Sequence, residues 1–170
     1  MLGVSSFRIF APMKELIHIC HYKLYAYDEL SEQDRQLIDE AQCATGRSYA
    51  PYSYFQVGAA VLLDDGTVLT GSNQENVAYP SGLCAERTAL FSAGSAYPEK
   101  AVVALAIAAC MEGKFTRNPI TPCGACRQVM LETELRHHTP MRILLYGTEG
   151  VCVIEGGVGE LLPLSFDSFR

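Results

Sequence analysis

Hydrophobic and polar positions alternate along the chain in a way that divides it into short helices and strands. Residues 31–46, SEQDRQLIDEAQCATG, open with Ser31 and Asp34 at the spacing of a capping pair, and their hydrophobic residues recur at helical intervals. Gly46 follows the last of them. The pattern predicts an amphipathic helix that begins after Ser31 and ends at Gly46.

Several further runs have the pattern of strands. FQVGAAVLL (55–63) and TVLTG (67–71) flank the turn DDG, which predicts a β-hairpin. The run AVVALAIAA (101–109) is hydrophobic throughout, as is typical of a strand covered on both faces. Two more strands are expected near the carboxyl end, at 141–147 and 151–155.

Residues 15–27 alternate only in part, and we expect a strand there. Residues 83–95 have the pattern of a helix closed by Gly94, with Pro98 preventing its continuation. Another helix is expected to begin near Cys123. Helices that alternate with buried strands indicate an α/β fold, and we predict a three-layer α/β/α sandwich with a mixed central sheet.

Composition and charge narrow the class of protein. The 170 residues suit one domain, and the formal net charge is −6 without any Lys/Arg cluster, so a polynucleotide is not the expected partner. No hydrophobic run approaches the roughly 18 residues of a membrane helix, so we expect no membrane partner. Residues 1–12 lack the features of a signal peptide, and we interpret them as an optional extension before Met13.

The seven cysteines do not have the pattern of a disulfide framework, because their number is odd and their spacing irregular. Thiols that stay reduced in the cytoplasm fit better. Three of them lie in the motifs CAERTAL (84–90) and PCGACRQVM (122–130), each at a predicted helix start, where the free N–H groups and the helix dipole favour thiolate.

Together these motifs suggest a catalytic zinc site. Cys84, Cys123 and Cys126 can offer three thiolates to one Zn²⁺ per chain, leaving the fourth tetrahedral position for water. Glu86 lies beside this site and can transfer a proton between water and substrate. Arg87 and Arg127 adjoin the motifs and are expected to donate hydrogen bonds to the sulfurs.

In this arrangement the chain resembles the small-chain, zinc-dependent cytidine deaminases. The resemblance rests on both cysteine motifs and on the segments APYSYFQVGAAV (50–61), GSNQENVAYPSGLCAE (71–86) and ELLPLSF (160–166). It implies the hydrolytic deamination of cytidine and 2′-deoxycytidine in pyrimidine salvage, by zinc-activated water with Glu86 as the proton shuttle. We expect residues 31–170 to form this catalytic domain and 1–30 an amino-terminal extension.

The resemblance also implies the substrate contacts. Phe55 would stack on the pyrimidine, and the backbone N–H of Ala85 would bind its carbonyl oxygen. Asn73 and Glu75, at i and i+2, share one face of an extended strand and would bind ribose hydroxyls, chiefly the 3′-hydroxyl. Because Glu75 would repel a phosphate, a free nucleoside is the expected substrate. The carbonyl of Thr121 would assist the departing amine.

Members of this family are commonly homotetramers that share active sites between subunits. By that resemblance, Tyr79 and Phe166 are expected to reach a neighbouring subunit's pocket.

Other interpretations of the same residues remain. A closed structural zinc site would take a fourth thiolate, and the candidates are Cys43, Cys110 and Cys152. A redox pair of Cys123 and Cys126 would leave Cys84 without a role. Deamination of a cytosine-bearing antibiotic nucleoside such as blasticidin S is the alternative within enzymes. No histidine is assigned a catalytic role.

Overall fold

A computed structural model describes residues 14–168 of the chain. The interpretation of residues 1–12 as an optional extension lies outside that range. The helices and strands are β1 (Lys23–Tyr25), α1 (Glu32–Thr45), β2 (Phe55–Leu63), β3 (Val68–Ser72), α2 (Ala85–Ala96), β4 (Val102–Met111), β5 (Lys114–Phe115), α3 (Gly124–His137), β6 (Arg142–Gly147) and β7 (Gly150–Ile154). Short 3-10 turns are η1 (Tyr27–Glu29), η2 (Tyr79–Ser81) and η3 (Val158–Glu160).

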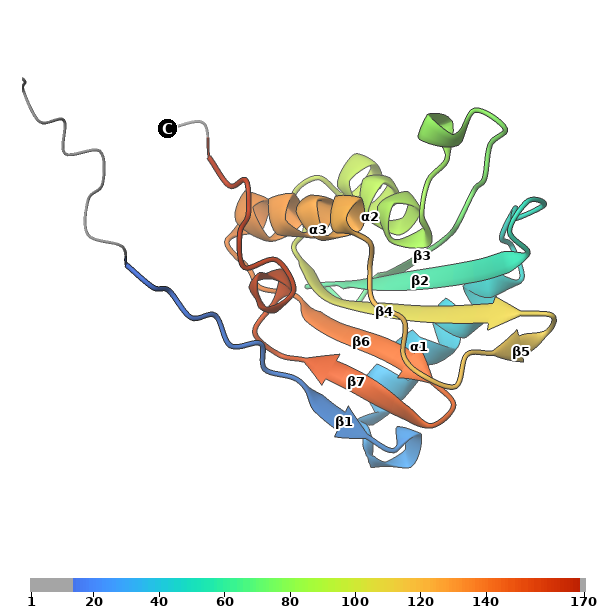
Figure 1. Ribbon diagram of the computed structural model, residues 1–170, viewed down its shortest axis with the longest axis horizontal. Helices are drawn as coiled ribbons and strands as arrows, with labels where there is room; N and C mark the ends of the chain where they lie inside the picture. The colour runs from blue at the N-terminus through green and yellow to red at the C-terminus, as the bar shows by residue number, and fades with distance from the viewer. Residues whose placement is uncertain (1–13, 169–170) are drawn as a thin grey trace, which may run out of the picture.

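The strands form one mixed sheet in the order β1-β7-β6-β4-β2-β3, with β5 paired to β4. The β4–β6 pair is parallel, and the other pairs are antiparallel. Helix α1 covers one face of the sheet, and α2 and α3 lie side by side over the other (Figure 1). The predicted three-layer α/β/α sandwich with a mixed sheet is therefore confirmed.

Strand β4 lies between two hydrophobic layers, as its continuous hydrophobic run predicts. Leu105 and Ile107 pack in the core beneath α2 and α3, whereas Ala104 and Ala106 face α1. Successive side chains of a strand point to opposite faces, so one strand supplies both cores. Small alanines on the α1 side let that helix lie close to the sheet.

Two glycines bring helices into direct contact with the hairpin. A Cβ at Gly58 would lie 2.1 Å from the carbonyl oxygen of Ala41 in α1, and a Cβ at Gly71 would lie 2.4 Å from the amide nitrogen of Ala89 in α2. Neither helix has room for a side chain at these points. The contact at Gly71 holds α2 against β3, so the start of α2 lies next to the residues that follow β3.

The predicted helix at 31–46 and the predicted hairpin agree with the structure. Ser31 caps α1 by accepting a hydrogen bond from the Asp34 amide at 3.1 Å. The prediction of a strand over 15–27 is wrong for most of that range, because only Lys23–Tyr25 pair with β7. Residues 14–22 are exposed and form no ladder. Their hydrophobic side chains have no neighbouring strand on which to pack.

The helix expected at 83–95 begins at Ala85 and continues past Gly94 to Ala96. Gly94 does not end the helix. A Cβ there would lie 3.0 Å from a guanidinium nitrogen of Arg136 in α3, so the glycine gives room for the neighbouring helix. Among the described helices, none is long and hydrophobic enough to cross a membrane.

Candidate metal centre and adjoining pocket

Three cysteines from two helix starts meet at one point. Cys84 is the capping residue of α2, Cys123 is the capping residue of α3, and Cys126 lies in the first turn of α3. The Sγ atoms of Cys84 and Cys123 are 3.8 Å apart, those of Cys123 and Cys126 are 3.4 Å apart, and all three lie within 4.8 Å of one another. Tetrahedral thiolates about 2.3 Å from a zinc ion are about 3.8 Å from each other, so the spacing fits Zn²⁺.

The three thiols influence one another's ionisation. The hydrogen bond with Cys126 and the nearby Arg87 guanidinium lower the pKa of the Cys84 thiol to about 5. The same hydrogen bond raises the pKa of Cys126 well above its ordinary value, because a second negative charge beside the first is unfavourable. All three could be thiolates together only with a positive ion among them. Within residues 14–168 no fourth ligand joins the cluster, which argues against a closed four-ligand site.

The two arginines beside the motifs have different contacts. A guanidinium nitrogen of Arg87 lies 4.0 Å from Cys84 Sγ and 3.4 Å from the carbonyl oxygen of Gly82. Arg127 instead donates to the carbonyl oxygens of Pro122, at 2.9 Å, and Leu161, at 2.7 Å. The expected contact with sulfur is therefore present for Arg87, and the corresponding expectation for Arg127 is wrong.

Glu86 is a buried acid beside the three thiols. It is the second residue of α2, its exposed fraction is 4 %, and it lines the adjoining pocket. Burial raises the pKa of its carboxyl group, since water no longer stabilises the charged form. A higher pKa makes the carboxyl group a stronger proton acceptor, as a group that moves a proton between water and substrate needs to be.

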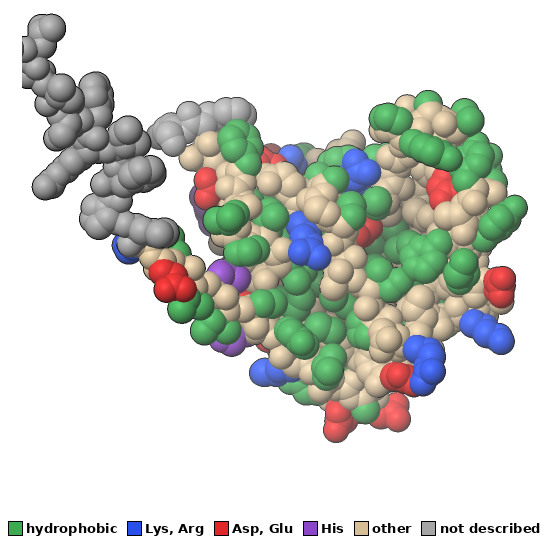
Figure 2. Space-filling model, in the orientation of Figure 1, with side chains coloured by type: hydrophobic (Ala, Val, Ile, Leu, Met, Phe, Trp, Pro, Cys, Tyr) green, Lys and Arg blue, Asp and Glu red, His purple; other side chains and the backbone are tan. Residues whose placement is uncertain are grey.

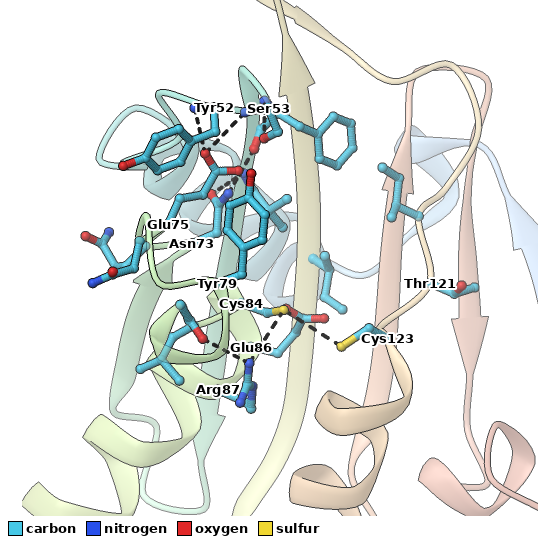
Figure 3. Close-up of a pocket in the computed structure, with 18 residues that line it drawn as sticks. Tyr52, Ser53, Asn73, Glu75, Tyr79, Cys84, Glu86, Arg87, Thr121 and Cys123 are labelled. Carbon is cyan, nitrogen blue, oxygen red and sulfur yellow. Dashed lines mark hydrogen bonds between the residues drawn. The ribbon is translucent and has the colours of Figure 1, made fainter.

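The pocket next to this centre has a volume of about 650 Å³, within the size range of small-molecule sites. Its walls come from β2, from the segment after β3, from the start of α2 and from the loop before α3. In Figure 2 hydrophobic side chains border a hollow beneath the η2 loop. Figure 3 shows Asn73 and Glu75 toward one end of the pocket, with Cys84, Cys123 and Glu86 toward the other.

Asn73 and Glu75 follow the end of β3 and both line the pocket. Glu75 accepts hydrogen bonds through Oε2 from the amides of Tyr52, at 2.9 Å, and Ser53, at 3.2 Å. Hydrogen bonds from the Ser53 side chain and from the Tyr52 amide lower the pKa of Glu75. Glu75 is therefore a charged acceptor at neutral pH.

Phe55, Thr121 and Tyr79 also line the pocket. Tyr79 lies on η2 with 77 % of its surface exposed, and its ring meets that of Tyr52 edge to face at 6.4 Å between centroids. Ala85 is buried as the first residue of α2, so its amide belongs to the first turn, where N–H groups have no acceptor within the helix.

Phe166 is expected to reach the pocket of a neighbouring subunit, and a single chain does not test that expectation. It is 61 % exposed and does not line the pocket of its own chain. Its carbonyl oxygen accepts a hydrogen bond of 2.7 Å from the Gln128 side chain, which ties the carboxyl-terminal segment to α3.

Some contacts made to the pocket residues Asn73 and Glu75 carried no signal in the sequence. The amides of Tyr52 and Ser53 bind Glu75 across more than twenty residues of chain, and Ser48 donates a hydrogen bond to Asn73. Backbone amides have no sequence signature, and an isolated serine has none either.

Comparisons with known proteins agree with this geometry. Residues 31–139 match the family model described as the cytidine and deoxycytidylate deaminase zinc-binding region. A cytidine deaminase of Halalkalibacterium halodurans is 47 % identical over 134 residues, covering 78 % of this chain and 94 % of that protein. One from Mycobacterium tuberculosis is 46 % identical over 131 residues, covering 74 % and 82 %.

Solved structures give the same result. The crystal structure of a cytidine deaminase from Burkholderia pseudomallei superimposes with a TM-score of 0.66 at 41 % identity, covering 81 % of this chain and all of that one. The cytidine deaminase structure from Mycobacterium tuberculosis gives a TM-score of 0.60 at 36 % identity, covering 77 % and 94 %.

Proposed function

Since the chain belongs to the cytidine and deoxycytidylate deaminase family, we propose that it converts cytidine and 2′-deoxycytidine to uridine and 2′-deoxyuridine, releasing ammonia, in pyrimidine salvage. One observation carries this proposal. The buried carboxyl of Glu86 adjoins three clustered thiols in a pocket that also holds an amide and a carboxylate suited to a sugar.

Cys84, Cys123 and Cys126 would hold one Zn²⁺ per chain, with Arg87 offsetting part of the thiolate charge. When bound, zinc supplies Lewis acidity that makes a water molecule a nucleophile near neutral pH. The rest of the reaction falls to residues of the chain.

Glu86 takes a proton from the attacking water, which adds to carbon 4 of cytosine. Glu86 then delivers that proton to ring nitrogen 3 and transfers the second proton of the water to the departing amine. The carbon–nitrogen bond then breaks and ammonia leaves. The position of Glu86 beside the thiols and the raised pKa of its carboxyl group support this role as a proton shuttle.

The other pocket residues would orient the nucleoside. Phe55 stacks on the pyrimidine, the Ala85 amide donates to its carbonyl oxygen, and the Thr121 carbonyl accepts from the amine. Asn73 and Glu75 bind the 3′-hydroxyl. Each of these roles is supported by position: four of the five residues line the pocket, and Ala85 opens the helix that contains Glu86.

We propose a nucleoside rather than a nucleotide as substrate, a distinction that matters because the matched family model covers deoxycytidylate deaminases too. Glu75 and Glu86 are acidic, and Arg87 is the one Lys or Arg among the described residues lining the pocket. That arginine already contacts Cys84 and Gly82. A phosphate would meet repulsion without a free cation to bind it.

The remaining proposals concern the whole protein. Tyr79 and Phe166 expose large hydrophobic surfaces, which supports a homotetramer in which they complete a neighbouring subunit's pocket. The free thiols of the described residues support a cytoplasmic location. The division at residue 30 stays a prediction, and Lys23–Tyr25 of the proposed extension form an edge strand of the sheet.

Turnover of several cytosine compounds by the zinc-loaded protein tests these proposals, with the ultraviolet change from cytosine to uracil as the readout. Cytidine and 2′-deoxycytidine should be converted, and cytidine and deoxycytidine monophosphates should be at least about 100-fold poorer substrates, the loss expected when a phosphate enters a site without a partner charge. Faster turnover of the nucleotides or of blasticidin S would contradict the assigned substrate.

A further inference from the structure

The segment after α1 lies alongside the residues that follow β3. Ser72 Oγ donates to the carbonyl oxygen of Arg47 at 2.9 Å, the Tyr49 amide donates to the carbonyl oxygen of Asn73 at 3.0 Å, and the Glu75 amide donates to the carbonyl oxygen of Tyr49 at 2.8 Å. Ser48 lies between these contacts. Its backbone is therefore fixed beside Asn73 by hydrogen bonds that do not involve its own side chain.

The side-chain amide of Asn73 has one possible orientation. Its Oδ1 accepts from the amide of Val57 at 2.8 Å and from the hydroxyl of Ser48, and its Nδ2 donates to the carbonyl oxygen of Phe55 at 2.9 Å. A backbone N–H can only donate and a carbonyl can only accept, so oxygen and nitrogen cannot be exchanged. One N–H of Asn73 remains for a ligand.

Glu75 supplies a hydrogen-bond acceptor beside that N–H donor of Asn73. Its Oε2 is occupied by the amides of Tyr52 and Ser53, and its lowered pKa keeps it charged, so it can only accept. The two residues together offer one donor and one acceptor to the pocket. A hydroxyl group satisfies both at once, because it can accept from Asn73 while it donates to Glu75.

We propose that Ser48 is a positioning residue for sugar recognition, since its hydroxyl holds the Asn73 amide with an N–H directed at a substrate hydroxyl. The inference rests on the proposed function for the identity of the ligand as a nucleoside. Asn73 also bonds the backbone of Phe55 and Val57. Ser48 therefore acts on the same side chain that links the sugar site to the residue expected to stack on the base.

Loss of the Ser48 hydroxyl should affect this contact more than it affects the fold. The Asn73 amide would keep its two backbone partners but would lose the third, and would be held less firmly. The contacts that fix the segment are made by Arg47, Tyr49 and Ser72, so they remain in Ser48→Ala. The variant should be folded, with a weaker interaction between Asn73 and the sugar.

The test compares cytidine with 3′-deoxycytidine, which lacks the hydroxyl. In Ser48→Ala, kcat/KM for cytidine should fall about three- to tenfold, the effect of one hydrogen bond, mainly through KM. For 3′-deoxycytidine it should change by less than about twofold, because the contact is already missing. Ser72→Ala is the matched control: it removes a nearby hydroxyl bonded to Arg47 and should lower kcat/KM for both substrates by the same factor.

An equal loss on both substrates in Ser48→Ala would overturn the proposal, since it would indicate a purely structural role. Calorimetric binding of uridine and 3′-deoxyuridine to the zinc-loaded proteins gives a second readout that needs no turnover. If the wild-type protein fails to convert cytidine, the proposed function fails. The role of Ser48 still fails separately if its replacement weakens the binding of both uridines equally.

Discussion

Cys84 and Cys123 are the capping residues of two different helices, α2 and α3, and their Sγ atoms lie 3.8 Å apart. The two helices lie side by side on one face of the sheet, and both begin at this point (Figure 1). An ion bound by the three cysteines would join the starts of both helices. The metal centre is therefore expected to stabilise the α2–α3 layer as well as to serve the reaction.

Cys126 is the buried member of the three proposed zinc ligands. Cys126→Ser should reduce zinc affinity by more than the roughly 10- to 100-fold that changes around the ligands cause, because it removes a ligand itself. It should also lower the melting temperature of the zinc-loaded protein. Metal analysis after dialysis and thermal unfolding measure both effects. Cys43→Ser, at an exposed position of α1, is the control, and full zinc retention in Cys126→Ser would contradict the assignment.

Arg87 should influence the metal without binding it. Replacement by Gln removes the positive charge near Cys84 and should weaken zinc affinity about 10- to 100-fold, while raising the pKa of the Cys84 thiol in the metal-free protein. Competition with a chelator measures the affinity, and the rate of thiol alkylation against pH measures the pKa. Arg136→Gln, near the far end of α3, should change neither. Unchanged affinity in Arg87→Gln would exclude this role.

Local signals in the sequence predicted much of the fold and part of the site. The Ser31 cap and the turn between β2 and β3 are formed by neighbouring residues, and the hydrophobic run of β4 shows burial directly. The failed strand before Lys23 shows the limit of this approach. A hydrophobic pattern reports a tendency to pair, but pairing needs a neighbouring strand, and the ladder of β7 extends only to Lys23–Tyr25.

The residues of the site also divide into those that the sequence predicted and those that it did not. The cysteines and Glu86 were predictable because residue type and spacing carry their chemistry. The contacts of Ser48 and Arg127 were not, because each bonds a partner that is brought close only by tertiary packing. The carboxyl-terminal segment is a further case, since the Gln128 side chain of α3 donates a hydrogen bond to the carbonyl oxygen of Phe166, which lies far from it in the sequence.

The contact between α1 and β2 predicts intolerance to any side chain at Gly58. Gly58→Ala should destabilise the protein by about 1–3 kcal/mol or more, since the added Cβ would meet the α1 backbone at 2.1 Å. Denaturant unfolding gives the free energy. Gly159→Ala is the control, because a Cβ there has no atom within 4 Å. A Gly58→Ala protein with wild-type stability would contradict the direct packing of helix on strand.

The partly buried carboxyl group of Glu134 should make the stability of the folded protein depend on pH. Burial raises the pKa of its carboxyl group, although the amides of Met141 and Val158 donate to it. A raised folded-state pKa means that protonation favours the folded protein. The stability that this group contributes is therefore present below its ordinary pKa and is lost as pH rises through the folded value.

The variant Glu134→Gln keeps an acceptor oxygen but carries no charge. It should be at least as stable as the wild type at pH 7. Its advantage should shrink as the pH falls through the raised folded-state pKa toward the ordinary value of 4.5, because the wild-type carboxyl is then protonated in the folded protein. Chemical unfolding across this range measures the difference. Glu132→Gln, on the exposed surface of the same helix, should show no such trend. An advantage that grows on acidification would contradict the sign of the shift.

The central claim is that Glu86 moves the proton in a zinc-dependent deamination. The most direct measurement follows the ultraviolet conversion of cytidine by zinc-loaded wild type and Glu86→Gln, with the zinc content of both determined. The account predicts full zinc in both proteins, conversion to uridine by the wild type, and kcat in the variant reduced by about 10²- to 10⁴-fold. Equal turnover by the two zinc-loaded proteins would contradict it.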